Sequence, residues 1–332
     1  MPAPTSDTTL QRPDLGAVVY EYIEGAPGMG YIGLDVMPIF EVIEQSAGFP
    51  VIPKEALLSL PDTKRAMRGT YNRSDYDFED GYYATSENGW EELIDDRERS
   101  LYANRFDADV VAAMRATRII LGGQEKRIAD KVFNASNFAA NSVGNEWDDA
   151  SNATPIDDVN TGKLSVRSAC GLLPNVLIIA YSTYLNLKRC DQVVDLLKYT
   201  FPGIDINRMT SAQLAAVFDI ERVLVGGAVY NSAKKGQDAS ISDLWSSEYA
   251  MLTRVSSSPD LREPCIGRTF LWTRESPGNT VVEEYREEKA RADVFRVRHD
   301  TDECFIQSKD EDGAAKSTIY TAVSYLMDNI TE

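Results

Sequence analysis

The chain has 332 residues, 43% of them hydrophobic, which is enough to bury one substantial core or two modest ones. Its formal net charge of -18 excludes a protein that coats nucleic acid through a basic surface, but it suits a container whose wall does not grip its contents. No apolar run approaches the roughly 20 residues that cross a bilayer, and the polar N-terminus has no hydrophobic signal region, which predicts a chain that is intracellular at synthesis and has no membrane partner.

Residues 1–30 carry no helical period, and their prolines and glycines predict an extended arm around one strand, Ala17 to Ile23. The glycines from Gly25 to Gly30 follow this strand, where a nucleotide-binding loop would lie. Their order differs from that of dinucleotide-binding loops, and Gly33 and Pro38 interrupt the place where a phosphate-binding helix would begin. The segment therefore predicts no nucleotide site.

From Tyr31 to Gly89 the pattern predicts three strand segments, Tyr31 to Val42, Phe49 to Leu60 and Asp77 to Ala84, with too few apolar residues for a core of their own. A long two-stranded ribbon is only marginally stable in water, so we expect ribbon and arm to contact other subunits. A disordered loop, or one packed on its own domain, is the alternative. The charged side chains of this region are Lys64, Arg65, Arg68, Arg73, Asp75, Asp77, Glu79 and Asp80.

Around Trp90 the pattern changes to that of one long amphipathic helix. Asp107 is its expected N-cap, and Gly122–Gly123 predicts a kink or a close contact. Charged residues, among them Glu125 and Arg127, are expected away from the apolar stripe. The stripe consists of Phe106, Val110, Met114, Thr117, Leu121, Ile128 and Val132.

Trp147 to Val159 is a turn-rich connector between this extended front half and a compact back half. Pro155 favours extended geometry at Thr154, and Asp157 or Asp158 is expected to cap whatever follows.

The back half predicts strands alternating with helices. Val176 to Ala180 is a continuous apolar run, typical of a strand buried on both faces. Ser182 is the expected cap of a helix from Thr183 to Tyr199, and Thr210 to Gln213 forms a capping box before another helix. A second buried strand is expected from Arg222 to Tyr230.

The C-terminal part predicts strands from Val281 to Glu288 and from Asp293 to His299, with a short third at Cys304 to Ile306. Phe295, Val297 and His299 are expected on one face of their strand, and Arg296 and Arg298 on the other.

No catalytic, cofactor-binding or metal-ligating constellation is predicted, which argues against an enzyme. His299 is the only histidine, and its strand pattern predicts a structural role. Neighbouring acids such as Asp157 and Asp158 point to different sides of an element and do not form an acid–base pair. The cysteines are too far apart for a zinc or redox site and are predicted to be buried thiols: Cys170, Cys190, Cys265 and Cys304.

An ordered set of segments resembles the major capsid proteins of tailed phages, which have the Hong Kong 97-like fold. Trp147 to Val159 is similar to the W-x-D-x-x-S-x-P-I-x-D-I run of that family. The resemblance covers nearly the whole chain. It continues through Pro174 to Ile179, Leu197 to Tyr199, Leu214 to Phe218, Glu221 to Asn231, Trp245, Tyr249 to Val255, and Tyr320 with Tyr325.

The resemblance implies an α+β fold in four parts. These are an N-terminal arm (1–35), an extended loop formed by the ribbon (36–88), a peripheral domain with a long spine helix (89–170 and 274–309) and an α/β axial domain (171–273 and 310–332). It also implies a shell protein of the virion, assembled in the host cytoplasm into pentamers and hexamers of an icosahedral head around double-stranded DNA. No cofactor is implied.

The implied partners are other copies of the chain, a portal protein and decoration proteins. Because the arm before the ribbon is short, the resemblance also implies either a separate scaffolding protein or a chain that has already been trimmed, and Met1 favours the former. Some relatives weld subunits through a lysine–asparagine bond promoted by a glutamate. Lys54 and Lys64 lie in the ribbon, but no matching partners are identified, so this chemistry is not carried over. Two other hypotheses are an encapsulin-type nanocompartment shell and a soluble α/β enzyme.

Overall fold

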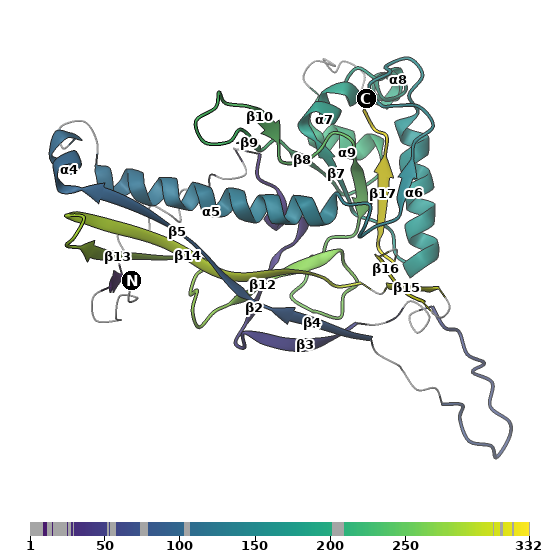
Figure 1. Ribbon diagram of the computed structural model, residues 1–332. Helices are drawn as coiled ribbons and strands as arrows, with labels where there is room; N and C mark the ends of the chain where they lie inside the picture. Colours follow the sequence, from purple (N-terminus) through teal and green to yellow (C-terminus); the bar gives the residue numbers. More distant parts are fainter. Residues whose placement is uncertain are drawn as a thin grey trace.

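The computed structural model describes residues 9–11, 15, 25, 28, 30–51, 53, 58–73, 79–102, 107–200, 209–307, 309–312, 315–320 and 322–331. Helices and strands are mixed along the chain, so the fold is α+β. A 25-residue helix, α5 (Ala108–Val132), runs along one sheet and ends against a second (Figure 1). In the part of the chain that is described, no helix has the length and apolar character needed to span a membrane.

The first sheet is built around the long strand β14 (Ala292–Phe305). β5 (Ser86–Asp95) pairs with one edge of β14, so strands about two hundred residues apart share a sheet. Phe295 and Val297 are buried in the cluster beneath α5, and Arg296 and Arg298 alternate with them, which confirms the predicted faces. The other strands of this sheet are β1 (Thr9–Gln11), β2 (Ile39–Val42), β12 (Gly267–Trp272) and β13 (Val281–Glu287).

The second sheet has the order β6, β17, β11, β7, β8. All five residues of β7 are buried, as their continuous apolar run predicts. Helices α6 to α9 accompany this sheet (Figure 1), and Trp147 is fully buried in the shared core. The strands are β6 (Ala140–Ser142), β7 (Val176–Ala180), β8 (Arg222–Gly226), β11 (Ala250–Thr253) and β17 (Ser324–Asp328), and the helices are α6 (Pro155–Cys170), α7 (Tyr181–Leu187), α8 (Asp191–Thr200) and α9 (Ser211–Val217).

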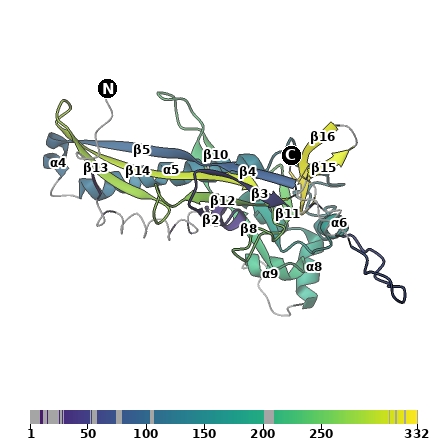
Figure 2. The same cartoon turned by 90° about the horizontal axis from the view of Figure 1, so that it is seen from below.

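Three two-stranded ribbons and two short helices complete the described elements. β3 pairs with β4 in antiparallel register, which confirms the predicted ribbon between the arm and the long helix. Residues 58–73 project from it as an extended loop (Figures 1 and 2). The elements are β3 (Ser46–Val51) with β4 (Glu79–Ala84), β9 (Val229–Asn231) with β10 (Ile241–Asp243), β15 (Lys309–Asp312) with β16 (Ala315–Tyr320), α2 (Gly33–Val36) and α4 (Asp96–Tyr102).

Two helix starts lie where the sequence predicts them. The Asp107 carboxylate accepts a hydrogen bond from the backbone N–H of Asp109 at the start of α5. Thr210 and Gln213 form the complete capping box of α9. In α6, however, Thr154 is the N-cap and makes no side-chain cap, while Asp157 and Asp158 lie in the first turn, where their charge favours the helix dipole.

Several predicted strands and boundaries were wrong. Trp90 lies in β5 and not in a helix, because pairing with β14 overrides the local helical preference of this glutamate-rich stretch. The segment Tyr31 to Val42 contains α2 before β2 begins at Ile39, and β3 ends at Val51. Cys304–Ile306 is not a separate strand, since β14 continues through Phe305 along β12. The predicted strand Ala17 to Ile23 falls outside the described residues.

The helices of the back half also differ from the prediction. The expected helix from Thr183 to Tyr199 is two helices, α7 and α8, separated by a turn at Lys188–Cys190. α7 starts directly after β7 with Ala180 as its N-cap, so Ser182 caps nothing, and its buried hydroxyl has no partner among the described residues. β8 is an edge strand with an exposed Arg222 and stops at Gly226, before β9.

Candidate assembly surfaces

The loop of residues 58–73 carries apolar side chains that the subunit itself does not cover. Leu60 is 98% exposed, Met67 is 95% exposed and Tyr71 is 70% exposed. The loop has four basic residues and one acid, Asp62, in a chain whose net charge is -18. Exposed apolar groups with a local charge opposite to that of the rest of the molecule are typical of a binding surface.

Contacts inside the loop give it a defined shape. The Arg65 guanidinium lies 4.7 Å from the centre of the Tyr71 ring, and its Nε donates to the carbonyl of Gly69. Asn72 donates to the carbonyl of Asp62 across the loop. Within the described residues, the side chains of Lys64, Arg68 and Arg73 form no ion pair. These three basic side chains of the ribbon region therefore face solvent. Of the other predicted charges, Asp75 and Asp77 lie outside the described residues.

Aromatic stacking joins the ribbon to the first sheet. The Phe270 ring of β12 stacks on Tyr83 of β4 with 4.4 Å between ring centres and on Phe49 of β3 with 5.3 Å. Gly81 is required here, because a Cβ at this position would lie 2.3 Å from the Phe49 ring. The base of the loop is thereby fixed while its tip is free to contact another molecule.

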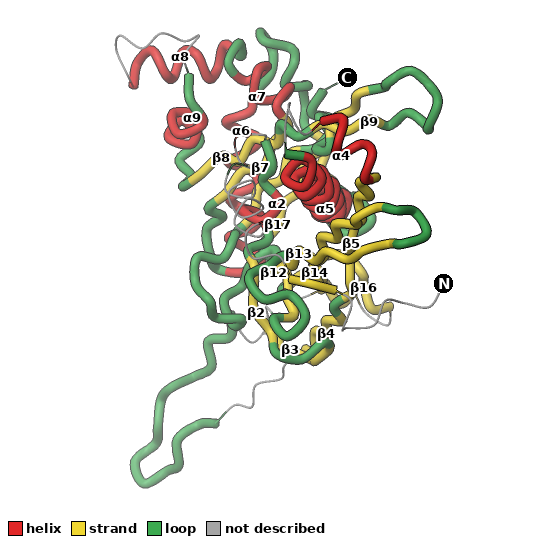
Figure 3. The backbone as a smooth tube through the Cα atoms, turned by 90° about the vertical axis from the view of Figure 1, so that its left-hand side faces the viewer, coloured by secondary structure: helices red, strands yellow, loops and turns green. Residues whose placement is uncertain are grey.

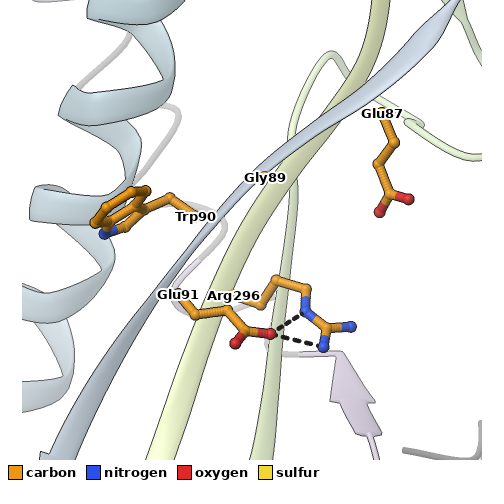
Figure 4. Close-up of a pocket in the computed structure, with 5 residues that line it drawn as sticks. All are labelled: Glu87, Gly89, Trp90, Glu91 and Arg296. Carbon is orange, nitrogen blue, oxygen red and sulfur yellow. Dashed lines mark hydrogen bonds and ion pairs between the residues drawn. The ribbon is translucent and has the colours of Figure 1, made fainter. Parts of the chain in front are cut away.

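The face of the first sheet that points away from α5 carries a ladder of ion pairs. Arg296 binds Glu91 on β5 at 2.7 Å and Glu283 on β13 at 3.3 Å. Arg298 binds the same Glu283 at 3.0 Å. Figure 4 shows a shallow depression here, in which Glu91 and Arg296 point toward each other while the Trp90 ring points to the helix side. Cross-strand pairs of this kind fix the register of the sheet.

A second ion-pair cluster fixes the end of the sheet near α4. Arg286 lies 2.6 Å from Asp96 and 3.0 Å from Asp293, and Arg99 also binds Asp293. The hydrogen bonds from Arg286 lower the pKa of Asp96, and those from Arg286 and Arg99 outweigh burial in lowering the pKa of Asp293. Both carboxylates therefore stay ionised and paired well below neutral pH.

A buried carboxylate on α5 joins three segments of the chain. Glu125 is 4% exposed, and its oxygens accept the backbone N–H groups of Ile32 and Gly33 at 2.8 Å and the indole N–H of Trp245 at 2.7 Å. Burial raises the pKa of Glu125, although these three hydrogen bonds oppose the effect. Gly33 must lack a side chain, since a Cβ there would lie 2.6 Å from the Glu125 carboxylate.

The prediction that Glu125 lies off the apolar stripe was wrong. The residue follows Leu121 by four positions and precedes Ile128 by three, which is the spacing of the buried face. That spacing predicts a buried position for Glu125, whereas the charge of its side chain favours a position on the helix surface. Met114, a predicted stripe residue, is instead 36% exposed. Phe106, another stripe residue, lies outside the described residues.

His299 lies beneath α5, as a structural histidine should. It is fully buried, and burial together with the nearby Arg127 guanidinium lowers its pKa to about 4. Arg127 itself binds Glu303 at 2.9 Å. His299 is therefore neutral at physiological pH, and it has no neighbouring nucleophile or carboxylate that would suit catalysis among its described contacts.

The cysteines, acids and lysines considered in the sequence analysis are not brought together into a site within the described residues. No group of three or more His, Cys, Asp or Glu side chains in the described ranges is placed to hold a metal ion. All four cysteines are free thiols, and Cys170, Cys190 and Cys265 are buried, whereas Cys304 is partly exposed. Burial raises the pKa of Cys265 to about 11, which makes it unreactive. Lys54 lies outside the described residues, and Lys64 lies in the exposed loop.

Comparisons of sequence identify two relatives. The chain is 29% identical over 276 residues to a protein of Burkholderia phage BcepMu named major capsid protein, covering 80% of this chain and 86% of the relative. It is 23% identical over 265 residues to the major capsid protein of Pseudomonas phage JBD67, covering 78% of this chain and 82% of the relative. No family model matches the chain.

Comparisons of structure show the same fold in solved proteins. A phage-related protein from Bordetella bronchiseptica RB50 matches with a TM-score of 0.67 and 21% identity, covering 97% of this chain and 98% of that one. A virus-like particle from Pyrococcus furiosus matches with a TM-score of 0.55 and 11% identity, covering 95% of this chain and 98% of that one.

Proposed function

We infer that this chain is a major capsid protein of a tailed phage, and we propose that its copies form the pentamers and hexamers of an icosahedral shell around double-stranded DNA. The resemblance that the sequence motifs indicate is confirmed by the two capsid relatives. The hypothesis of a capsid shell protein therefore holds, and the nanocompartment alternative is not favoured. The protein belongs to the virion capsid, and assembly in the host cytoplasm is part of the proposal.

The observation that supports self-assembly most directly is the exposed loop of residues 58–73. Burying a side chain such as Leu60 or Met67 is worth about 1.5–3 kcal/mol, yet the subunit leaves both almost fully in water. A second copy supplies acidic surface to the basic loop, since the chain is acidic overall. A closed symmetric assembly buries one such loop for every copy.

We assign the parts of the Hong Kong 97-like layout as follows. Residues 1–35 form the arm and residues 36–88 the extended loop, and α5 is the spine helix of the peripheral domain. The axial domain starts near residue 140 in this assignment, earlier than the sequence alone suggests, because β6 pairs with β17 and α6 contacts the second sheet. In this assignment β5, β12, β13 and β14 of the first sheet belong to the peripheral domain, and β1 of the arm and β2 of the extended loop pair with the edges of that sheet.

The remaining partners follow from this function. A portal protein, decoration proteins and a separate scaffolding protein complete the proposed head, and double-stranded DNA is enclosed without sequence-specific binding. We assign no enzymatic activity, because the relatives are structural proteins.

Charge reversal in the loop tests the proposal. Arg68→Glu and Arg73→Glu should lower the yield of closed shells in electron microscopy while circular dichroism shows a folded subunit. Arg68→Lys and Arg73→Lys are the matched controls. Arg68 has φ = 65°, and lysine and glutamate bear the same backbone strain there. Normal shells from both charge-reversal variants would contradict the role of the loop.

A further inference from the structure

One side of α5 is left open by the described residues. The first sheet packs against the helix on one side, while the hairpin of β9 and β10 rises on the other (Figures 1 and 3). Between Val111 and Gly123 the helix exposes residues at spacings of three and four, which form one continuous face. We call this face the α5 stripe, and it contains Val111, Met114, Arg115, Arg118, Ile119 and the pair Gly122–Gly123.

The α5 stripe is basic in an acidic chain. Residues 110–124 contain no acid, although acids make up 52 of the 332 residues. The side chain of Arg115 is 68% exposed, and its ion pair among the described residues is a long one, 3.7 Å to Glu92. Arg118 is exposed and forms no ion pair with any described residue. Both guanidinium groups are therefore available to a carboxylate from another molecule.

The cations beside the stripe are balanced by acids. Lys126, one turn further along α5, binds Asp130 at 2.9 Å. The hairpin of β9 and β10 adds no net charge, because its two exposed lysines are matched by two exposed acids; these residues are Lys234, Lys235, Asp238 and Asp243. An anionic partner is therefore attracted to Arg115 and Arg118 and not to a wide basic surface.

Glycine lies at the centre of the stripe. Gly122 follows Arg118 by four residues and Arg115 by seven, so the three positions lie along one line of the helix surface. A Cβ at Gly122 would meet no atom closer than the Tyr31 hydroxyl, at 3.6 Å, and one at Gly123 would meet none closer than 3.8 Å. The predicted close contact within the subunit is therefore absent at these two positions, and the subunit would accept alanine, which favours a helix more than glycine does. The missing side chains leave room for the backbone of a second molecule to come close to α5.

Apolar side chains flank the line from Arg115 to Gly122. Met114 is 36% exposed and Ile119 is 42% exposed, and the helical spacing places them on opposite sides of this line. Val111, which is 38% exposed, lies on the line itself, one turn before Arg115. A purely ionic partner leaves these three side chains in water. A helix that has an apolar face with acids along its margins covers them while its carboxylates reach the arginines.

We propose that the α5 stripe, centred on Arg115, Arg118 and Gly122, is the docking site for an acidic amphipathic helix of a second protein. The inference rests on the proposed capsid function, in which the separate scaffolding protein is the partner that supplies this helix. A helix fits better than an extended segment, because residues at spacings of three and four interlock with those of a second helix where glycine lets the two axes approach. Two such stripes repel each other, so the partner is not α5 of another copy.

Binding of a designed peptide tests the site. The probe has about 20 residues, enough to be helical, with leucine and alanine on one face and glutamate along both margins of that face. A second peptide has the same composition in scrambled order. Each is titrated against dissociated capsomers of the full chain by fluorescence anisotropy, and we expect the amphipathic peptide to bind about ten times more tightly. Equal affinities would overturn the proposal, since attraction of an acidic chain alone does not depend on residue order. Binding of a DNA duplex to the stripe without binding of the peptide would overturn it in favour of nucleic acid.

Two double variants locate the bound peptide. Arg115→Glu/Arg118→Glu should weaken peptide binding about tenfold, because it replaces two attractive charges by two repulsive ones. Lys289→Glu/Arg291→Glu makes the same change of charge at the turn between β13 and β14 and should leave the affinity unchanged. Equal losses in the two variants, or no loss in either, would overturn the proposal.

Gly122→Ala separates docking from a structural role. The variant subunit should unfold at higher urea concentration, because alanine favours the helix and its Cβ has room, yet it should bind the peptide several-fold more weakly. Unchanged peptide affinity would overturn the close approach of a helix, and so would a lower urea midpoint, which would show that the glycine serves the packing of the subunit. If the unmodified chain builds no shells, the proposed function fails; if shells form but the peptide does not bind the stripe, only this inference fails.

Discussion

Replacing Glu125 by alanine should destabilise the subunit more than any change to an exposed acid. The substitution leaves three buried N–H donors without an acceptor, those of Ile32, Gly33 and Trp245. Each such donor costs about 1–3 kcal/mol, and loss of the desolvated carboxylate returns part of this sum, so we expect about 3–5 kcal/mol in total. The Glu125→Gln variant keeps the oxygen that accepts from two donors and should lose about 1–3 kcal/mol.

The assay is urea unfolding of dissociated subunits, followed by tryptophan fluorescence and circular dichroism. Asp130→Ala is the matched control on the same helix, because its side chain is 59% exposed and its ion pair among the described residues is with Lys126. It should change the free energy of unfolding by less than about 0.5 kcal/mol. A Glu125→Ala subunit as stable as this control would refute the view that the buried carboxylate joins the three segments.

Three further predictions concern other parts of the subunit. The pKa of His299 is lowered to about 4 in the folded chain, so the unfolded chain binds more protons between pH 6.5 and 4. The free energy of unfolding should therefore fall by about 3 kcal/mol as the pH drops through this window. His299→Gln should remove this component, measured as the difference between the free energies of unfolding of the two proteins at each pH. Thr210→Ala should cost about 1 kcal/mol of unfolding free energy in the same urea assay, because it breaks the capping box of α9, and an unchanged midpoint would contradict the capping role. Met67→Ser should leave the subunit unchanged because the side chain is 95% exposed, while assembled shells should dissociate at lower urea concentration; shells as resistant as the wild type would show that Met67 is not buried by assembly.

The features that the sequence predicted correctly are those that depend on neighbouring residues. Asp107 caps α5 and Thr210 caps α9 through backbone groups two and three positions away. The alternation of Phe295, Arg296 and Val297 follows from the pleat of a single strand. The buried strand β7 is a run of five apolar residues, and its burial follows from composition alone.

The features that could not be predicted depend on distant segments. β5 contains Trp90 in an acidic stretch that favours helix locally, and it becomes a strand only because β14 provides a partner about two hundred residues later. The partners of Glu125 lie about ninety and one hundred and twenty residues away. A local pattern therefore places a glutamate on the helix surface, whereas the folded chain satisfies its charge with donors that no local pattern reveals.

Groups that are bonded within the subunit stabilise its fold, whereas exposed apolar groups without contacts in the subunit are available for assembly. Buried polar groups such as Glu125 and Glu303 are bound by partners within the subunit, so their loss should be measured as unfolding. The loop of residues 58–73 gains almost nothing from its own subunit at Leu60 and Met67, so burial of these two side chains requires contact with another molecule. A contact of a few kcal/mol per copy is weak enough for an incorrectly placed subunit to leave, yet a closed ring combines several such contacts and becomes stable. Strengthening one loop contact should consequently harm assembly by trapping errors, although it would stabilise any single pair of subunits.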